Sequence, residues 1–331
     1  LADTTKTLRV FGLSFCRRSS TLFQPALAGP VDPNFCLGPG DGLVLILTGD
    51  VETAHELTVT REGFIAIPQV GQMSVANLTL TQLEDLLYTR LGRVYSGVRR
   101  GPGATTHFHV TVAKLRTVQV YVTGEVARPG SFQISAAGTA LTALYAAGGP
   151  GLSGSFRRVE IRRGGQLLDS LDLYDYLLHG DNSHDARLEN GDVVFVPPRL
   201  TQVKVAGEVV RPAIYELRSG ETLRELLQAS GGFGVRALRR RVQIDRILAP
   251  TERAPGGRDR VVIDLASDQF VDGRGPPFPM LPGDSVTVFQ VSERRREMVR
   301  VKGNVWTPGD LGWTPGMRLG DAILLAGGPK P

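Results

Sequence analysis

The stretch VYVTGEVARPGSFQISAAGTALTALYAAGG, residues 120–149, decides the fold because the chain repeats it. A second copy, VKVAGEVVRPAIYELRSGETLRELLQASGG, occupies residues 203–232, and a third, VRVKGNVWTPGDLGWTPGMRLGDAILLAGG, occupies residues 299–328. The copies align without gaps, and in each the first glycine precedes the double glycine by the same 24 residues. Such repetition indicates one structural unit used in tandem.

Each copy is predicted to begin with a β-hairpin. In the first copy Val120 and Val122 alternate with polar residues, which is the period-two pattern of a half-buried strand. A proline with its fixed φ then starts the turn. The positions that recur around this turn, either as turn and packing residues or as subunit contacts, are Gly124, Glu125, Arg128, Pro129, Gly207, Glu208, Arg211, Pro212, Gly303 and Pro308. The paired glutamates and arginines are interpreted mainly as exposed pairs, with contact to sugar hydroxyls as the alternative.

A short helix is predicted to follow each hairpin and to end at the double glycine. Apolar residues recur at i, i+3 and i+4, as in Ala140, Ala143 and Leu144 of the first copy. The first two copies then continue in step to the Gly-Asp turns at 191–192 and 283–284, and each turn leads into an alternating strand. The sequence therefore predicts β-grasp modules of about 80 to 90 residues, each with a mixed sheet and one packed helix.

A related block precedes the repeats. LVLIL at 43–47 is predicted as a strand, REG at 61–63 as a turn, and HFHVTVAKL at 107–115 as a strand. Leucines at helical spacing from Leu80 predict a helix capped by Thr79 or Thr81. The expected fold class is α+β, and the expected boundaries are an irregular N-terminal segment at 1–36, a first domain at 37–116, repeats at 117–200 and 201–291, and a partial repeat at 297–331.

The composition fits a folded protein of several domains. The 331 residues are 41% hydrophobic and 21% charged, and the net charge of +5 comes mostly from arginine. Arginine runs at 156–163, 235–246 and 293–302 are interpreted mainly as exposed faces of strands, with binding of an acidic polymer as a hypothesis. No aromatic residues are interleaved for stacking on bases, so a nucleic-acid partner is not predicted.

Few residues suggest chemistry. Cys16 and Cys36 are either a disulfide or two free thiols. His107 and His109 alternate along one strand, but no third ligand is near in sequence, so surface or interface histidines are favoured over a metal site. The oxygen-rich segment 179–192 lacks the spacing of a calcium loop. No nucleophile elbow, phosphate loop or zinc motif occurs, so neither an enzyme nor a cofactor is predicted.

The combination of motifs resembles one bacterial family. LGPGD at 37–41, GFIAIPQVGQMSVANLTLTQLEDLL at 63–87, and the VTGEVARPG and VAGEVVRPA segments are similar to the polysaccharide export proteins. The resemblance covers about residues 9–328, and it implies an export domain followed by soluble-ligand-binding β-grasp repeats.

The resemblance also implies a function and partners. It implies a ring of identical subunits in the periplasm, associated with the outer membrane, that conducts a capsular or extracellular polysaccharide and works with an inner-membrane copolymerase. The alternative interpretation is a non-enzymatic periplasmic scaffold or adhesion module that binds a ligand or sugar. A closed oligomer distinguishes the two, because a conduit requires a ring and a binding module does not.

Overall fold

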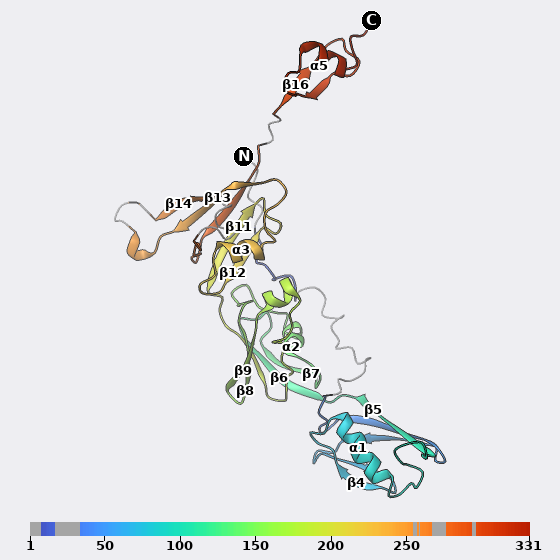
Figure 1. The fold of residues 1–331 in the computed structure, drawn as a ribbon. Helices are drawn as coiled ribbons and strands as arrows, with labels where there is room; N and C mark the ends of the chain where they lie inside the picture. The colour runs from blue at the N-terminus through green and yellow to red at the C-terminus, as the bar shows by residue number, and fades with distance from the viewer. Residues whose placement is uncertain (1–7, 17–33, 254–256, 258, 267–275, 293–295) are drawn as a thin grey trace.

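The computed structural model describes residues 8–16, 34–253, 257, 259–266, 276–292 and 296–331. It confirms the expected α+β fold, with mixed sheets and short helices. Figure 1 shows four bodies in chain order, from the one that carries α1 to the small one that carries α5. We call residues 34–116 the N-domain, 117–200 module 1, 201–291 module 2 and 297–331 module 3.

The N-domain packs one helix with a three-stranded antiparallel sheet and a separate hairpin. The sheet has the order β2-β1-β5, and the hairpin is β3-β4. The elements are β1 (Gly42–Gly49), β2 (Thr53–Thr58), β3 (Phe64–Ile67), β4 (Gly71–Ser74), α1 (Leu80–Leu91) and β5 (Thr106–Lys114). Thr79, one of the two predicted caps, caps α1 in a capping box with Gln82. Every second residue of β1, such as Leu43 and Leu45, faces the core.

Module 1 is a five-stranded mixed sheet with the order β7-β6-β10-β8-β9. Its elements are β6 (Thr117–Gly124), β7 (Gly130–Ser135), α2 (Ala140–Ala146), β8 (Val159–Arg163), β9 (Gln166–Leu171), the π-helical turn η1 (Asp175–His179) and β10 (Val193–Val196). The last strand, β10, pairs parallel with the first, β6, and antiparallel with β8. The returning strand in the middle of the sheet is what makes the module a β-grasp unit.

Module 2 repeats this topology in the order β12-β11-β15-β13-β14, with β15 parallel to β11. Its elements are β11 (Thr201–Gly207), β12 (Ala213–Leu217), α3 (Leu223–Ala229), β13 (Ala237–Ile247), the 3-10 turn η2 (Pro250–Glu252), β14 (Arg260–Leu265) and β15 (Ser285–Gln290). Thr222 caps α3 with a capping box to Glu225. The sequence repeat is therefore a repeat of the fold.

Module 3 contains the hairpin and the helix of the same unit. They are β16 (Met298–Val301), β17 (Gly309–Gly312) and α5 (Leu319–Leu325). All three module helices end as predicted at a double glycine with φ between 77° and 82°. The second glycine of each pair donates its N–H five residues back, for example from Gly149 to the Leu144 carbonyl at 2.8 Å. None of the described helices has both the length and the apolar character to cross a membrane.

A buried aspartate paired with an arginine recurs in the three larger bodies. The aspartate of each Gly-Asp turn is almost fully buried and accepts the backbone N–H three residues earlier, as Asp284 does from Leu281 at 2.9 Å. The pairs are Arg116 with Asp41, Arg163 with Asp192, and Arg246 with Asp284. The turn that precedes the next strand is thus fixed by a charge-assisted hydrogen bond. The sequence shows the aspartates, but not their arginine partners.

Candidate functional site

The described N-terminal residues 8–16 form a strap across modules 1 and 2. Val10 bridges to Ile214 in parallel, so the strap extends the sheet of module 2 at the outer edge of β12. Phe11 N–H donates to the Ile214 carbonyl and Ile214 N–H donates to the Arg9 carbonyl, both at 2.9 Å. The sequence predicted an irregular segment over 1–36; residues 1–7 and 17–33 lie outside the described residues. The strap covers a sheet edge that would otherwise be open to other chains.

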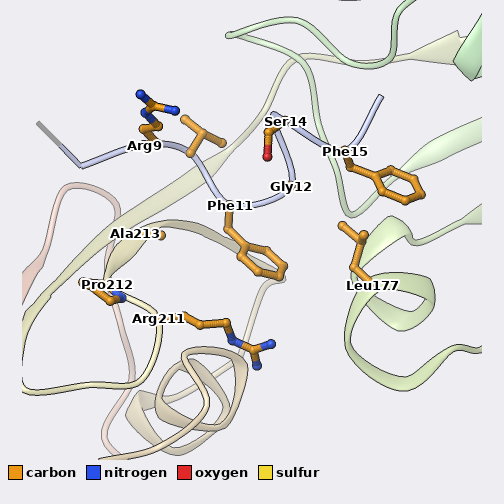
Figure 2. Close-up of a pocket in the computed structure, with 10 residues that line it drawn as sticks. Arg9, Phe11, Gly12, Ser14, Phe15, Leu177, Arg211, Pro212 and Ala213 are labelled. Carbon is orange, nitrogen blue, oxygen red and sulfur yellow. The ribbon is translucent and has the colours of Figure 1, made fainter. Parts of the chain in front are cut away.

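An aromatic cluster joins the strap to both modules. The Phe11 ring lies 5.0 Å from Tyr174 of module 1 and 5.1 Å from Tyr215 of module 2, measured between centroids. Figure 2 shows the Phe11 ring and the Arg211 side chain approaching one another, with the guanidinium carbon 5.7 Å from the ring centroid. Further along the strap, Phe15 lies beside Leu177 in the same view and packs on other aromatic rings of module 1. The strap therefore contacts two modules with apolar side chains.

A cleft of about 660 Å³ lies between the strap and the two modules, and Figure 2 shows the residues that line it. Its lining is mixed, with Arg9, Ser14 and Arg211 beside the aromatic rings. Pro212, one of the predicted turn prolines, also lines it. The repeat signature of module 2 therefore lies next to the strap.

A carboxylate of module 2 is inserted into module 1. Glu216 on β12 is 4% exposed, and its carboxylate accepts hydrogen bonds from Ser155 Oγ and Phe156 N–H, both at 2.7 Å. The Glu216 N–H donates to the hydroxyl of Tyr174 at 3.0 Å. Burial raises the pKa of Glu216, and the hydrogen bonds from Ser155 and Phe156 oppose that rise. Satisfying both carboxylate oxygens is what makes burial of this group tolerable.

We call this contact between modules 1 and 2 the joint. Arg157 of module 1 is the charged residue at its centre. Its side chain is 10% exposed and donates to Asp172 of module 1 at 2.8 Å and in a bidentate manner to Glu221 of module 2 at 3.0 Å. Its guanidinium also lies over the Tyr174 ring, 4.6 Å from the centroid. Arg218 of module 2 pairs with Asp172 as well. Burial alone would lower the pKa of Arg157, but the bonds to Asp172 and Glu221 raise it.

A larger groove of about 820 Å³ opens beside this network. It combines apolar side chains, Leu200, Met280 and Leu281, with Arg158 and Arg218. Leu200 is 74% exposed. Convergent apolar and charged groups of this kind suit a small or extended ligand at the boundary between two modules.

Two of the recurring glycines lie where a paired parallel strand approaches closely. Gly124 and Gly207 have φ of 85° and 86°, and a Cβ on either would lie 2.1 Å or 2.0 Å from the carbonyl oxygen of Val196 or Val288 in the neighbouring parallel strand. Gly303 has φ of 105°, but a Cβ added there would meet nothing within 4 Å. The first two positions therefore exclude any side chain, and the third requires only the backbone conformation.

The recurring arginines contact the helix of their own module. Arg128 donates to the Ala146 carbonyl at 2.9 Å, and Arg211 donates to the Ala229 carbonyl at 3.2 Å, at the C-terminal ends of α2 and α3. Thr307 occupies this position in module 3 and donates to the Ala326 carbonyl. These side chains satisfy carbonyls that a helix end leaves free.

The recurring glutamates bind other partners than these arginines. Glu125 accepts from the Ser153 hydroxyl, and Glu208 pairs with Arg236 at 3.1 Å. The predicted Glu-Arg pairs are therefore not formed in either module. The prolines Pro129 and Pro308 are exposed in the turns that follow. Contact of any signature residue with a neighbouring subunit stays a prediction.

The interpretation of the arginine run at 156–163 as an exposed strand face is wrong for Arg157. The alternation with Val159 and Ile161 is real, but Arg157 precedes the strand and is buried by module 2. Arg163 also pairs inward, with Asp192. The pattern of residues within one module does not indicate which of its side chains the next module buries.

Both cysteines are free in the structure, so the alternative of a Cys16–Cys36 disulfide is not formed there. Cys16 ends the strap and packs against Gly149 of module 1, whereas Cys36 bridges to Thr79 in the N-domain. Burial raises the pKa of the Cys16 thiol to about 12. The physical reason is that the two thiols belong to different bodies.

We expect a thiol reagent to label only one cysteine in the native protein. Cys36 is exposed, whereas Cys16 is buried and stays protonated at pH 8, and the thiolate is the reactive form. Ellman's reagent should titrate one thiol per native chain and two per chain in guanidinium chloride. Two fast-reacting thiols in the native protein would show that the strap does not cover Cys16.

No group of three or more potential metal ligands comes together within the described ranges. His107 and His109 are both exposed on β5, where they lie opposite Thr48 and Ile46 of β1. The oxygen-rich segment 179–192 is largely exposed and connects η1 to β10.

Comparisons with known proteins follow the same domain order. A family model described as polysaccharide biosynthesis/export protein matches residues 29–112. Models described as SLBB domain match residues 118–196, and residues 202–263 with 298–331. Together they extend over the N-domain and all three modules.

Curated relatives carry names of transport proteins. The polysialic acid transport protein KpsD of Escherichia coli is 29% identical over 188 residues, 56% of this chain and 32% of KpsD. The EPS I polysaccharide export outer membrane protein EpsA of Ralstonia solanacearum is 34% identical over 178 residues, 53% of this chain and 45% of EpsA. EpsA of Ralstonia nicotianae is 32% identical over 188 residues, 47% of its length. The chain thus spans about a third to a half of these relatives.

Proposed function

This chain belongs to the polysaccharide export family, and we propose that it is a structural subunit of a channel that exports capsular or extracellular polysaccharide. In this proposal the protein lies in the periplasm and is associated with the outer membrane, which the printed name of EpsA mentions. It contributes architecture and no chemistry of its own. Its partners are further copies of itself, the polysaccharide cargo and an inner-membrane copolymerase.

The observation that carries the proposal is the fixed joint between modules 1 and 2. A closed ring requires every subunit to present its contact surfaces at the same angle. The strap, the aromatic cluster and the Arg157 network all connect the two modules, so their relative orientation is set within each chain. A rigid two-module column is the kind of subunit from which a ring is built.

A second candidate function rests on the groove beside Arg158 and Arg218. A volume of about 820 Å³ with apolar and charged walls is adequate for a sugar or another small ligand. In this candidate the protein is a periplasmic ligand-binding scaffold, and it has no need of a closed oligomer. The two functions therefore differ in the assembly they require.

Ring formation is tested by the mass of the assembled protein. We expect light scattering of the purified chain, with and without detergent, to give a multiple of 35.7 kDa. Negative-stain images should show a closed ring with a central opening. A monomer under all conditions, together with saturable sugar binding in the groove, would favour the scaffold instead.

A further inference from the structure

The arginine runs of modules 1 and 2 are the same element of the repeat. Ile161 pairs with Val194 in module 1, and Ile244 pairs with Val286 in module 2, which places the two isoleucines at equivalent positions. Counting back from them, Arg157 and Arg158 correspond to Arg240 and Arg241, 83 residues later. The same side chains are therefore presented at the same end of each module.

In module 1 the run is neutralised by acids on both sides of the joint. Arg157 binds Asp172 of its own module and Glu221 of module 2. Arg157 also donates to the backbone carbonyl of Glu216 at 3.3 Å. Arg157 thus holds the two modules together, whereas Arg158 is exposed and pairs with Glu160 of its own module.

The next module does not supply those acids to Arg240. With the 96-residue offset from Gly207 to Gly303, Glu216 corresponds to Gly312 and Glu221 corresponds to Met317. In the strand register Asp172 follows Leu171, the partner of Val159, and the residue in that place in module 2 is Ala266, which follows Leu265, the partner of Val242. The nearby Asp264 binds Arg241, at 2.8 Å and 3.1 Å. Module 3 therefore cannot neutralise the arginines of module 2 as module 2 neutralises those of module 1.

The backbone also turns this run outward. Ala237 pairs with Gln290 and Val242 pairs with Val288, so four residues of β13 stand opposite Phe289 alone. Such a bulge lifts side chains out of the regular sheet pattern. The three arginines at 239–241 are all exposed. Module 1 has the same irregularity, since Gly154 bridges to Pro198 as Ala237 does to Gln290, so Arg157 is buried there by module 2 and not by a different backbone.

Two of these arginines lie over aromatic rings. The guanidinium carbon of Arg239 lies 5.7 Å from the centroid of Phe233, and that of Arg241 lies 4.8 Å from the centroid of Phe289. No other described residue forms an ion pair or hydrogen bond with the side chain of Arg239 or Arg240. A guanidinium stacked on a ring loses little freedom when its N–H edge binds a carboxylate.

We propose that Arg239 and Arg240, beside the Arg241–Asp264 ion pair, form a binding site for the carboxylate groups of an acidic polysaccharide. The inference rests on the proposed export function and names the cargo class, sugars that carry a carboxylate. An arginine side chain can donate two parallel hydrogen bonds to a carboxylate. A neutral sugar has no carboxylate and cannot accept them in this way. A polymer with regularly spaced carboxylates can occupy both of these arginines at once.

The test measures binding of a labelled decamer of galacturonic acid to the full chain by fluorescence anisotropy, with a neutral maltodextrin decamer as the comparison. We expect the Arg239→Gln, Arg240→Gln double variant to bind the acidic decamer at least about tenfold more weakly, since charge-assisted contacts are lost. The affinity of the wild type should also fall as salt is raised. The matched control is Arg61→Gln, Arg93→Gln, which removes the same charge from exposed positions of the N-domain.

Equal binding by the double variant and the control would overturn the site. A double variant that binds the decamer normally but assembles into smaller oligomers would also overturn it, because the arginines would then be a subunit contact. Both variants should keep the wild-type circular dichroism spectrum and melting temperature.

A cellular assay separates this inference from the proposed function. In a strain that lacks the gene for this chain and produces an acidic polysaccharide, the wild-type gene should restore surface polymer and the double variant should restore much less. If the wild-type gene restores nothing, the proposed function fails. If both genes restore export equally, only the arginine site fails.

Discussion

Replacing Gly207 by alanine is expected to destabilise module 2 by at least about 3 kcal/mol, since an added Cβ would lie 2.0 Å from the Val288 carbonyl oxygen. The contact is with backbone, so no side chain can move aside. Relief requires β11 and β15 to separate at their parallel pairing, which lies in the middle of the sheet. Urea unfolding followed by circular dichroism, with hydrogen exchange of β11 amides, measures the loss.

Gly303→Ala is the matched control, because it changes the same position of the repeat at a similar positive φ with open space around it. We expect it to cost only about 1–2 kcal/mol, the strain of a left-handed alanine. Both tryptophans of the chain, Trp306 and Trp313, lie in module 3, so their fluorescence follows this module alone. Equal losses for the two variants would show that backbone conformation, and not the close approach of the paired strand, explains the recurring glycine.

Much of the fold could be predicted because its signals are local. Alternating valines define the first strands of each copy, and leucines at helical spacing define α1 and α3. Thr79 and the double glycines mark where helices begin and end. These features act within a few residues of themselves, so they can be recognised without knowing the neighbours.

The joint could not be predicted in the same way, because its residues act across modules. Arg157 and Arg240 occupy the same position of the repeat, yet one is buried in ion pairs and the other is exposed. The difference lies in the following module, which offers Glu221 to the first and Met317 to the second. The difference could have been inferred only by comparing the acidic residues at equivalent positions of the repeat.

The strap illustrates the same limit. Phe11 and Gly12 stand in a short segment with no periodicity of its own, so their partners cannot be inferred from spacing. Ile214 on β12, which pairs with the strap, reads as an ordinary strand residue. No spacing within this segment indicates that it pairs with β12 of module 2.

Replacing Arg157 by alanine is expected to cost about 3–5 kcal/mol at pH 7, because it leaves Asp172 buried with one fewer cation and Glu221 without its bidentate partner. Modules 1 and 2 should then unfold less cooperatively and become open to proteases between residues 197 and 202. The control is Arg162→Ala, which removes an exposed arginine from a surface pair with Glu160 and should cost under about 1 kcal/mol. Chemical unfolding of the three proteins at one pH gives the comparison.

The pH dependence identifies the cause of that loss. Burial raises the pKa of Asp172 above its ordinary value of 3.8, and the bond and charge of Arg157 oppose the rise, so removing Arg157 raises the pKa further. A carboxyl with a raised pKa in the folded state binds more protons there, so its contribution to stability is fully present below pH 3.8 and is lost as pH rises through the folded pKa. The deficit of the Arg157→Ala variant relative to wild type should therefore be larger at pH 7 than near pH 4. An equal deficit at both values would mean that Arg157 stabilises the joint through packing on Tyr174 and not through its charge.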